Sequence, residues 1–292
     1  MINETTRRRL ADLTEEYRSL TRTHPEALEQ IALAELAEGV QQSNAIENST
    51  LSLDDTERIL AGRLPVRGSD LREVYEARNL AAVTTDMLSR RDPLTIALIL
   101  QWHGSLLAGI RDDIAGRFRR GDEWVRVGGH VGANPAFVPD LLTDALRRFH
   151  DEADGAPIDA IARFHCEFEI IHPFVDGNGR IGRVLINKQL QDAHLPPVII
   201  RARNRTADYY PLFVHYGRSD DAGGMTRLIA VLLMEAVHKR VAMIGSPRII
   251  SLSDWARANG VRGTVAANKA KRQTLPAFRV RDRWMIAEDH RP

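Results

Sequence analysis

Residues 172–183 read HPFVDGNGRIGR, and this is the most informative stretch of the chain. Before it, apolar residues recur at three- and four-residue steps over 158–171, which is typical of an amphipathic helix. Pro173 disfavours helical backbone angles at His172, so we expect that helix to end there. After the second glycine of the stretch the apolar residues follow the helical period again. The sequence therefore predicts a helix, a glycine-rich loop and a second helix.

The residue types in this loop suit the binding of phosphate groups. Unpaired N–H groups at the start of a helix, together with the helix dipole, attract anions. Gly177 and Gly179 let the backbone approach an anion closely, and Arg180 and Arg183 add fixed positive charge. Asp176 supplies a hard oxygen ligand of the kind that Mg²⁺ takes alongside substrate phosphates. We therefore expect a phosphate site with a bound Mg²⁺ ion as cofactor.

A histidine at the edge of such a site has a chemical use. His172 can take up a proton near neutral pH, so it is a candidate general base for a hydroxyl nucleophile. The alternative interpretation is a tight interhelical turn, with His172 at a helix end and solvated arginines. The complete set of residue types favours the reactive site over the turn.

The segment HPFVDGNGRIGR is similar, at every defined position, to HPFx(D/E)GN(G/K)RxxR, the signature of the Fic family of nucleotidyltransferases. The resemblance implies a mainly α fold, a Fic-fold helical bundle with a β-hairpin flap. It also implies an enzyme that transfers AMP from ATP to a Ser, Thr or Tyr hydroxyl of a target protein, or of itself, and releases pyrophosphate.

The resemblance assigns a role to each residue of the loop. His172 would deprotonate the target hydroxyl, and Asp176 would hold Mg²⁺ against the phosphates. Asn178 and the backbone around Gly177 and Gly179 would form an anion hole. This arrangement agrees with the physics of phosphoryl transfer, in which positioning and charge neutralisation do most of the work.

Further residues are assigned to ATP by the same resemblance. Arg180 would support the β-phosphate and Arg183 would meet the γ-phosphate, and Phe174 of the signature is grouped with them. Tyr209 and Tyr210 resemble the aromatic pair that lies near the adenine in this family. Two adjacent tyrosines are otherwise usually half-buried core residues, so that alternative stays open.

An upstream segment resembles the inhibitory motif of the family, (S/T)xxxE(G/N). It reads SNAIEN from Ser43 to Asn48, and its position implies the class whose inhibitory helix precedes the Fic core. Glu47 would reach Arg183, neutralise it and block the placement of the γ-phosphate. A buried carboxylate–guanidinium pair can hold such a switch, because removing one partner strands the other charge. Glu47 could also position a water for the reverse reaction, the removal of AMP.

A hairpin is predicted in the middle of the chain. Residues 124–127 alternate apolar and polar, Gly128 and Gly129 interrupt them, and a second short segment follows at 136–139. The region 116–139 resembles the flap of the family, which aligns the chain of the target by strand addition. An ordinary surface hairpin is the alternative.

The remaining pattern is mainly helical. Apolar periodicity predicts helices over 31–40, 71–87, 94–110, 139–151 and 226–244. Composition shifts predict three domains: an N-terminal helical region with the inhibitory motif (1–92), a Fic catalytic core (93–245) and a C-terminal module (246–292).

The C-terminal module is basic, with ten lysines and arginines against four acidic residues over 248–292, a net charge of +6. A capping box at 251–254, a turn at 259–260, a basic helix from Gly263 and a hairpin around 281–282 follow one another. This order resembles a winged helix-turn-helix of the excisionase type. Such a module could bind DNA through the basic helix in a major groove. The alternative is a compact appendage with a solvated basic face, used for homodimer contacts or for nothing specific.

Two other functions compete with AMP transfer. Glu169 and His172, like Glu235 and His238, have the Glu-x-x-His spacing of di-iron helix bundles, although this leaves the glycine-rich loop unexplained. The chain could also be an ATP-sensing regulator that binds DNA without any transfer activity. The presence of both His172 and Asp176 argues against it, because a sensor needs neither a base nor a metal ligand.

Composition sets wider bounds. With 292 residues, 43% hydrophobic and 27% charged, and a net charge of +1, the chain has the composition of a globular protein without bulk attraction to nucleic acid or membranes. The only cysteine, Cys166, lies in an apolar helix, so we expect a buried thiol. A single cysteine cannot form a disulfide within the chain, which favours the cytoplasm. The apolar runs are too short to span a bilayer, so we expect no membrane partner.

Overall fold

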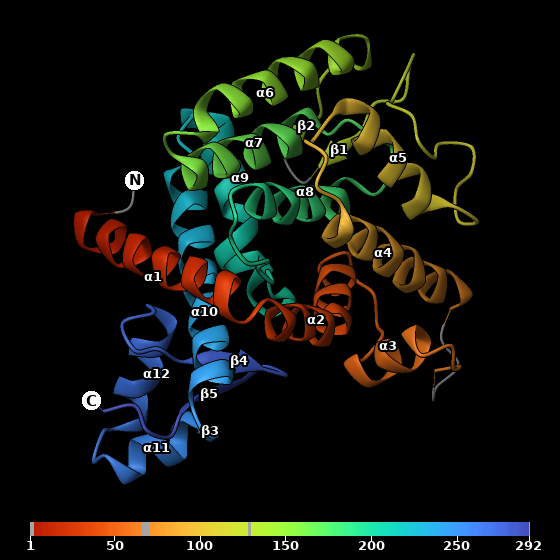
Figure 1. Ribbon diagram of the computed structural model, residues 1–292. Coiled ribbons are helices and arrows are strands. Elements are labelled where there is room, and N and C mark those ends of the chain that lie inside the picture. Colours follow the sequence, from red (N-terminus) through yellow and green to blue (C-terminus); the bar gives the residue numbers. More distant parts are fainter. Residues whose placement is uncertain (1–2, 66–69, 128–129, 292) are drawn as a thin grey trace. The chain divides into compact units, whose positions relative to one another are not determined.

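Helices account for most of the chain, as the apolar periodicity predicts. The computed structural model describes residues 3–65, 70–127 and 130–291 and is mainly α-helical, so the predicted fold class is confirmed (Figure 1). By packing, the chain divides into two compact units. The first unit holds residues 35–193 and 199–226, and the second holds residues up to 34, residues 194–198 and those from 227 on. The second unit thus groups the N-terminal helix with the C-terminal elements, whereas the predicted domain boundaries fall after residues 92 and 245.

The first unit is a helical bundle with one small hairpin. Its elements are α2 (Pro25–Ile46, which begins in the second unit), α3 (Leu53–Leu60), α4 (Leu71–Ser89), α5 (Ile96–Leu107), β1 (Arg126–Val127), β2 (His130–Val131), η1 (Pro135–Phe137), α6 (Val138–Ala153), α7 (Pro157–Ile171), α8 (Asn178–Asp192), η2 (Ala202–Asn204), η3 (Arg205–Tyr209) and α9 (Tyr210–Ser219).

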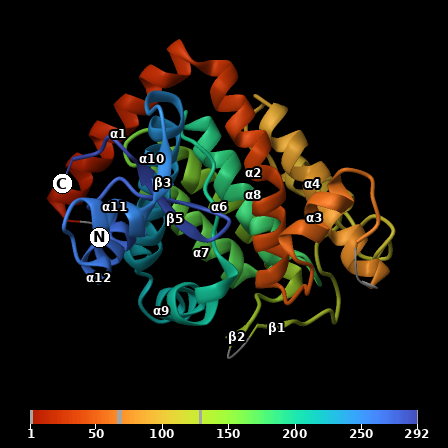
Figure 2. The ribbon, with the colours of Figure 1, turned by 90° about the horizontal axis from the view of Figure 1, so that it is seen from below.

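Helix α8 lies at the centre of this bundle. It packs against α4, α5 and α7, and α7 in turn packs against α6 and α9 (Figure 1, and from below in Figure 2). Most residues of α8 are buried, including its polar Lys188 and Gln189. The thiol of Cys166 on α7 is also fully buried, as predicted, and burial raises its pKa far above the ordinary value. The loop before α8 therefore begins from a rigid, enclosed helix pair.

The predicted helix–loop–helix is confirmed. Helix α7 begins at Pro157 and ends at Ile171. Its cap residue, His172, has a left-handed backbone (φ 52°), and its N–H donates to the carbonyl of Phe168. Helix α8 follows Gly177, which is also left-handed (φ 84°), a conformation that glycine adopts without strain. In the described residues no side chain caps the start of α8, so its first N–H groups face the loop.

One prediction about secondary structure needs correction. The flap hairpin pairs Arg126–Val127 with His130–Val131, so the predicted second arm at 136–139 is wrong. Pro135–Phe137 forms a 3₁₀ turn, and α6 begins at Val138 because Pro139 is tolerated in the first helical turn. Residues 128–129 of this hairpin, and part of the break predicted at 62–68, lie outside the described residues.

The second unit contains one long helix, a small sheet and three shorter helical segments. Its elements are α1 (Glu4–Thr23), most of α10 (Gly223–Gly245), β3 (Ile249–Ser251), α11 (Leu252–Ala258), α12 (Gly263–Lys271), β4 (Phe278–Val280) and β5 (Arg283–Ala287). Helix α1 was not predicted, because it is highly charged and buries only Leu10 and Tyr17.

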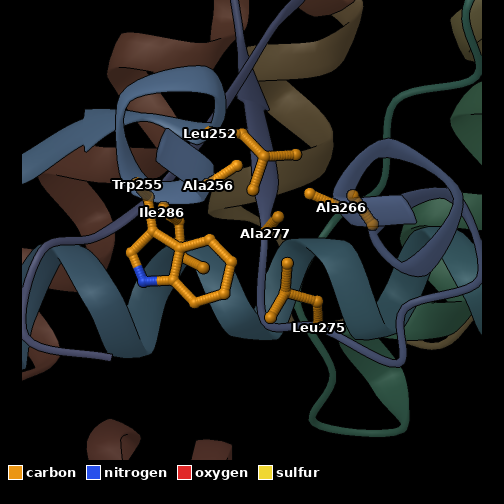
Figure 3. Close-up of a cluster of buried hydrophobic side chains, with 8 residues drawn as sticks. Leu252, Trp255, Ala256, Ala266, Leu275, Ala277 and Ile286 are labelled. Atoms are coloured by element: carbon orange, nitrogen blue, oxygen red, sulfur yellow. The ribbon is translucent and has the colours of Figure 1, made fainter. Parts of the chain in front are cut away.

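The sheet of the second unit is antiparallel, in the order β3-β5-β4. Strands β4 and β5 form the hairpin predicted around Arg281 and Asp282, both of which have positive φ. Trp255 of α11 is the largest side chain of the core beneath, and its indole N–H donates to the carbonyl of His290 at 2.9 Å. Figure 3 shows this core, which is made of Leu252, Trp255, Ala256, Ala266, Ala270, Leu275, Ala277 and Ile286.

Every helix within residues 3–65, 70–127 and 130–291 is too short or too polar to span a bilayer.

Candidate active site

The loop between α7 and α8 is held together by one amide side chain. Asn178 accepts a hydrogen bond from the N–H of Phe174 and donates one to its carbonyl, both at 2.8 Å. Its side chain therefore shapes the loop, and only its backbone is left for an anion. The ring of Phe174 is fully buried and stacks on His103, with ring centroids 3.7 Å apart, so this side chain is part of the core. Its grouping with the nucleotide-binding residues stays a prediction.

The side chain of His172 is mostly buried at the mouth of this loop. Its Nδ1 lies 3.3 Å from the carbonyl oxygen of Glu169 and 3.9 Å from the carboxylate of the same residue. A proton on Nδ1, donated to that carbonyl, places the basic lone pair on Nε2. Glu169 itself is buried, and burial raises the pKa of its carboxyl to about 8. The contacts of Nδ1 with Glu169 thus hold the imidazole in one orientation.

The carboxylate of Asp176 is bonded to two arginines. Arg180 donates to Oδ1 at 2.9 Å, and Arg72 from α4 lies 3.0 Å from Oδ2. Arg180 is buried and also lies 3.1 Å from Glu76, so its side chain holds Asp176 in place. Arg72 is 52% exposed and is therefore free to move into solvent. A partly exposed carboxylate beside a helix N-terminus suits Mg²⁺ together with substrate phosphates.

Glu47 lies over the glycine-rich start of α8. A side chain added at Gly179 would meet the Oε1 of Glu47 and the guanidinium of Arg183. Arg183 donates to Oε1 of Glu47 at 2.8 Å, and to the hydroxyl and the carbonyl of Ser43 at 2.9 Å each. The contact that the sequence predicted between Glu47 and Arg183 is therefore present. A carboxylate stands in the position that suits an anion.

The two adjacent tyrosines differ in their surroundings. Tyr209 is 3% exposed, and its hydroxyl lies 2.7 Å from Nε2 of His165, so its ring is part of the core. Tyr210 is 38% exposed, and its hydroxyl donates to the carbonyl of Ile46 at the end of α2. Only Tyr210 keeps enough open surface for the predicted contact with an adenine.

Two buried residues that the sequence reasoning missed hold the loop from outside. His103 on α5 lies with Nε2 3.0 Å from the carbonyl of Asp176, and its Nδ1 accepts the N–H of Gly116. Burial lowers the pKa of His103 to about 4, which keeps the ring neutral. Arg119 donates to the carbonyl of His172 at 2.7 Å. Nothing in their local pattern separates them from an ordinary core histidine and a surface arginine.

The di-iron interpretation lacks its ligands. In the part of the chain that the structure describes, no group of three or more His, Cys, Asp or Glu side chains could hold a metal ion together. Glu235 accepts from the backbone N–H of Arg279, and His238 lies 2.7 Å from Gln273.

Known proteins are similar to this chain in sequence and in fold. Residues 93–190 match the model of the Fic/DOC family. The chain is 31% identical over 230 residues to the protein adenylyltransferase fic-1 of Caenorhabditis elegans, covering 76% of this chain and 44% of that protein. It is 33% identical over 197 residues to the protein adenylyltransferase Fic of Drosophila melanogaster, covering 65% of this chain and 39% of that protein.

Solved structures of Fic proteins also resemble this chain in fold. A structure of Fic-1 from Caenorhabditis elegans superposes with a TM-score of 0.71 at 28% identity, covering 82% of this chain and 72% of that one. A Fic family protein from Desulfovibrio desulfuricans superposes with a TM-score of 0.70 at 24% identity. The match covers 100% of this chain and 98% of that one. The fold is thus that of Fic proteins, and the chain belongs to the Fic family through a domain over residues 93–190. It spans less than half the length of the curated relatives described here.

Proposed function

We propose that this chain transfers AMP from ATP to a Ser, Thr or Tyr hydroxyl of a target protein, and to itself. The observation that carries the proposal is the shared loop of His172 and the start of α8, with Asp176 between them. The loop combines a base, a hard oxygen ligand and an anion-binding helix end. The name protein adenylyltransferase, borne by relatives at 31–33% identity, supports the same chemistry.

The reaction follows from the chemistry of these groups. His172 would accept the proton of the target hydroxyl as its oxygen forms a bond to the α-phosphorus of ATP. The bond from that phosphorus to the oxygen of the β-phosphate breaks, and pyrophosphate leaves. The backbone N–H groups around Gly177 and Gly179 would stabilise the charge that develops on the phosphate oxygens.

Asp176 would hold a Mg²⁺ ion, whose chemistry is to neutralise charge on the phosphates. Arg180 would act through Asp176, because its guanidinium is buried against that carboxylate and Glu76. Arg183 would meet the γ-phosphate once its bonds to Glu47 and Ser43 are released. The exposed ring of Tyr210 would contact the adenine.

The inhibitory role of Glu47 belongs to the same proposal. Glu47 occupies the glycine-rich start of α8 and neutralises Arg183, and both effects oppose productive binding of a triphosphate. The same carboxylate could position a water for the removal of AMP from a modified protein. We further propose that the hairpin β1–β2 aligns the target chain by strand addition.

Incubation with α-labelled ATP and Mg²⁺ tests the proposal. The chain should label itself, and His172→Ala should abolish the labelling while ATP binding persists, because the base does not hold the phosphates. Incubation with a host lysate should reveal one or more labelled target bands. Equal labelling of the wild type and His172→Ala would overturn the role of the base.

A second candidate function concerns residues 246–292. The order strand, helix, turn, helix and hairpin, with an antiparallel sheet, supports a winged helix-turn-helix. Helix α12 buries Ala266 and Ala270 and exposes Lys269 and Lys271, so its open face suits the phosphates of duplex DNA. Fluorescence anisotropy with a labelled duplex should show salt-dependent binding that Lys269→Ala with Lys271→Ala weakens. A homodimer and a cytoplasmic location stay predictions.

A further inference from the structure

The backbone of His172 needs external support. Its φ of 52° lies in the left-handed region, which is unfavourable for a residue with a β-carbon. Such a conformation persists only where the surrounding structure holds it. The N–H of His172 donates to the carbonyl of Phe168. The carbonyl of His172 accepts a hydrogen bond from Arg119, a residue 53 positions away.

Arg119 binds three consecutive carbonyls around the base. Its Nε donates to His172 at 2.7 Å, and one terminal nitrogen donates to Ile171 at 3.2 Å. Its own backbone N–H donates to the carbonyl of Pro173 at 3.0 Å. The direction in which the backbone leaves α7, and with it the direction of the imidazole, is therefore set by this residue.

The same guanidinium also holds both sides of the flap. It donates to the carbonyl of Glu123, before β1, at 2.9 Å and to that of Ala133, after β2, at 2.7 Å. The N–H of Ala133 donates to Ile171 at 3.1 Å. Gly132 of the flap packs closely here: a β-carbon added to it would lie 3.0 Å from the guanidinium of Arg119 and 3.2 Å from Cβ of His172. Arg119 thus links the flap to His172, because its guanidinium donates hydrogen bonds to both.

The surroundings of Arg119 are costly for a charge. The residue is 2% exposed, and every acceptor that the structure gives it within the described residues is a neutral carbonyl. Burial lowers the pKa of this guanidinium. The charge of the nearby Glu123 carboxylate opposes this effect of burial but does not outweigh it. A buried cation whose hydrogen bonds all go to neutral carbonyls costs stability that an apolar residue would not, so its fork of donors serves geometry.

We propose that Arg119 is a positioning residue, which fixes the orientation of His172 and couples it to the flap that presents the target hydroxyl. This proposal rests on the proposed AMP transfer. Loss of the fork should slow the chemical step while ATP binding, which uses the start of α8, stays as it is.

The test uses the full chain with Glu47→Gly as the parent, so that transfer is measurable. Arg119→Lys keeps the charge and removes the planar fork. Its kcat for self-labelling should fall by roughly 10²-fold, as small misplacements of catalytic groups do, with the Kd for ATP within about twofold of the parent. Arg120→Lys, an exposed neighbour, is the matched control and should match the parent.

A second readout does not depend on transfer. Amide hydrogen exchange of Gly132 and Ala133, whose N–H groups donate to Val125 and Ile171, should lose protection in Arg119→Lys and keep it in the control. If the parent transfers no AMP, the proposed function fails, and the exchange experiment still tests the link between Arg119 and the flap.

Gly132→Ala tests the same link with Arg119 intact, should Arg119→Lys not fold. The added methyl should separate the flap from the base and lower kcat by about tenfold without changing the Kd for ATP. The proposal would be overturned if Arg119→Lys kept both the kcat and the amide exchange rates of the parent. It would also be overturned if this variant lost kcat and affinity for ATP by the same factor. Parental kcat in Gly132→Ala would do the same.

Discussion

Glu47 and Arg183, 136 positions apart, share a hydrogen bond of 2.8 Å directly over the first turn of α8. The guanidinium is buried while the carboxylate is 40% exposed. Ser43, one turn earlier on α2, binds the same guanidinium through its hydroxyl and its carbonyl. The carboxylate is therefore the partner that can leave, and the arginine is the partner that stays in place.

Glu47→Gly should raise self-labelling with α-labelled ATP, because it empties the start of α8 and frees Arg183 for the γ-phosphate. We expect an increase of at least about tenfold, the equivalent of roughly 1.4 kcal/mol. Ser43→Ala should raise labelling less, since the carbonyl of residue 43 still binds the guanidinium. Labelling of Glu47→Gly at the wild-type rate would contradict the inhibitory contact.

Arg72→Ala should lower the Mg²⁺ concentration that half-saturates ATP binding. The arginine lies 3.0 Å from the carboxylate of Asp176 and competes with a cation for it, so its removal should favour the metal several-fold. Mn²⁺ titrated in place of Mg²⁺ and followed by electron paramagnetic resonance reports the binding without any turnover. Arg78→Ala, at an exposed position of the same helix, is the control. An unchanged metal titration would show that Arg72 does not compete.

Acid should destabilise the first unit through His103. Burial lowers the pKa of this side chain to about 4, whereas in the unfolded chain it is close to 6.5. Between these values the unfolded chain takes up a proton that the folded chain does not. His103 alone should therefore lower the free energy of unfolding by about 3 kcal/mol as the pH drops from 6.5 to 4. The buried His165 of the same unit, whose pKa burial lowers to about 3, adds to this loss.

Urea unfolding at several pH values measures this loss. His103→Gln, which cannot titrate, should make the fall between pH 6.5 and 4 smaller by the contribution of His103, even though the variant is less stable at pH 7. The same replacement of the exposed His24 should leave the slope as in the wild type. A slope that His103→Gln leaves unchanged would assign the acid sensitivity to other groups.

Trp255→Ala should destabilise the second unit by about 3–5 kcal/mol, because it leaves a large cavity in a small core and removes the partner of the His290 carbonyl. Trp284→Ala, at a partly buried position where Arg279 covers the ring at 4.4 Å, should cost less. Thermal unfolding followed by circular dichroism measures both. Equal losses from the two changes would argue against a core centred on Trp255.

The helix–loop–helix could be predicted because its signals are local. Apolar periodicity marks α7 and α8, and a proline and two glycines mark the loop between them. The flap was predicted less well, since strands of two residues carry almost no alternation to read. Its second strand, His130–Val131, follows so closely on the first that the sequence suggested a later segment instead.

The roles of individual aromatic residues were harder to predict than the helices. Phe174 belongs to the signature and Tyr209 to the tyrosine pair, but tertiary packing turns both rings into the core, and no local pattern reports that direction. His103 and Arg119 escaped for a related reason. Each reaches the loop from a segment more than 50 residues away, so only the folded chain brings them together.

The lone cysteine has a practical consequence. Because Cys166 is fully buried and its thiol is held protonated, maleimide dyes should not react with the native chain. A cysteine placed at the exposed Trp124, beside the hairpin, would then be the sole reactive thiol of the molecule. A single dye at that position would report directly on the arrival of a target.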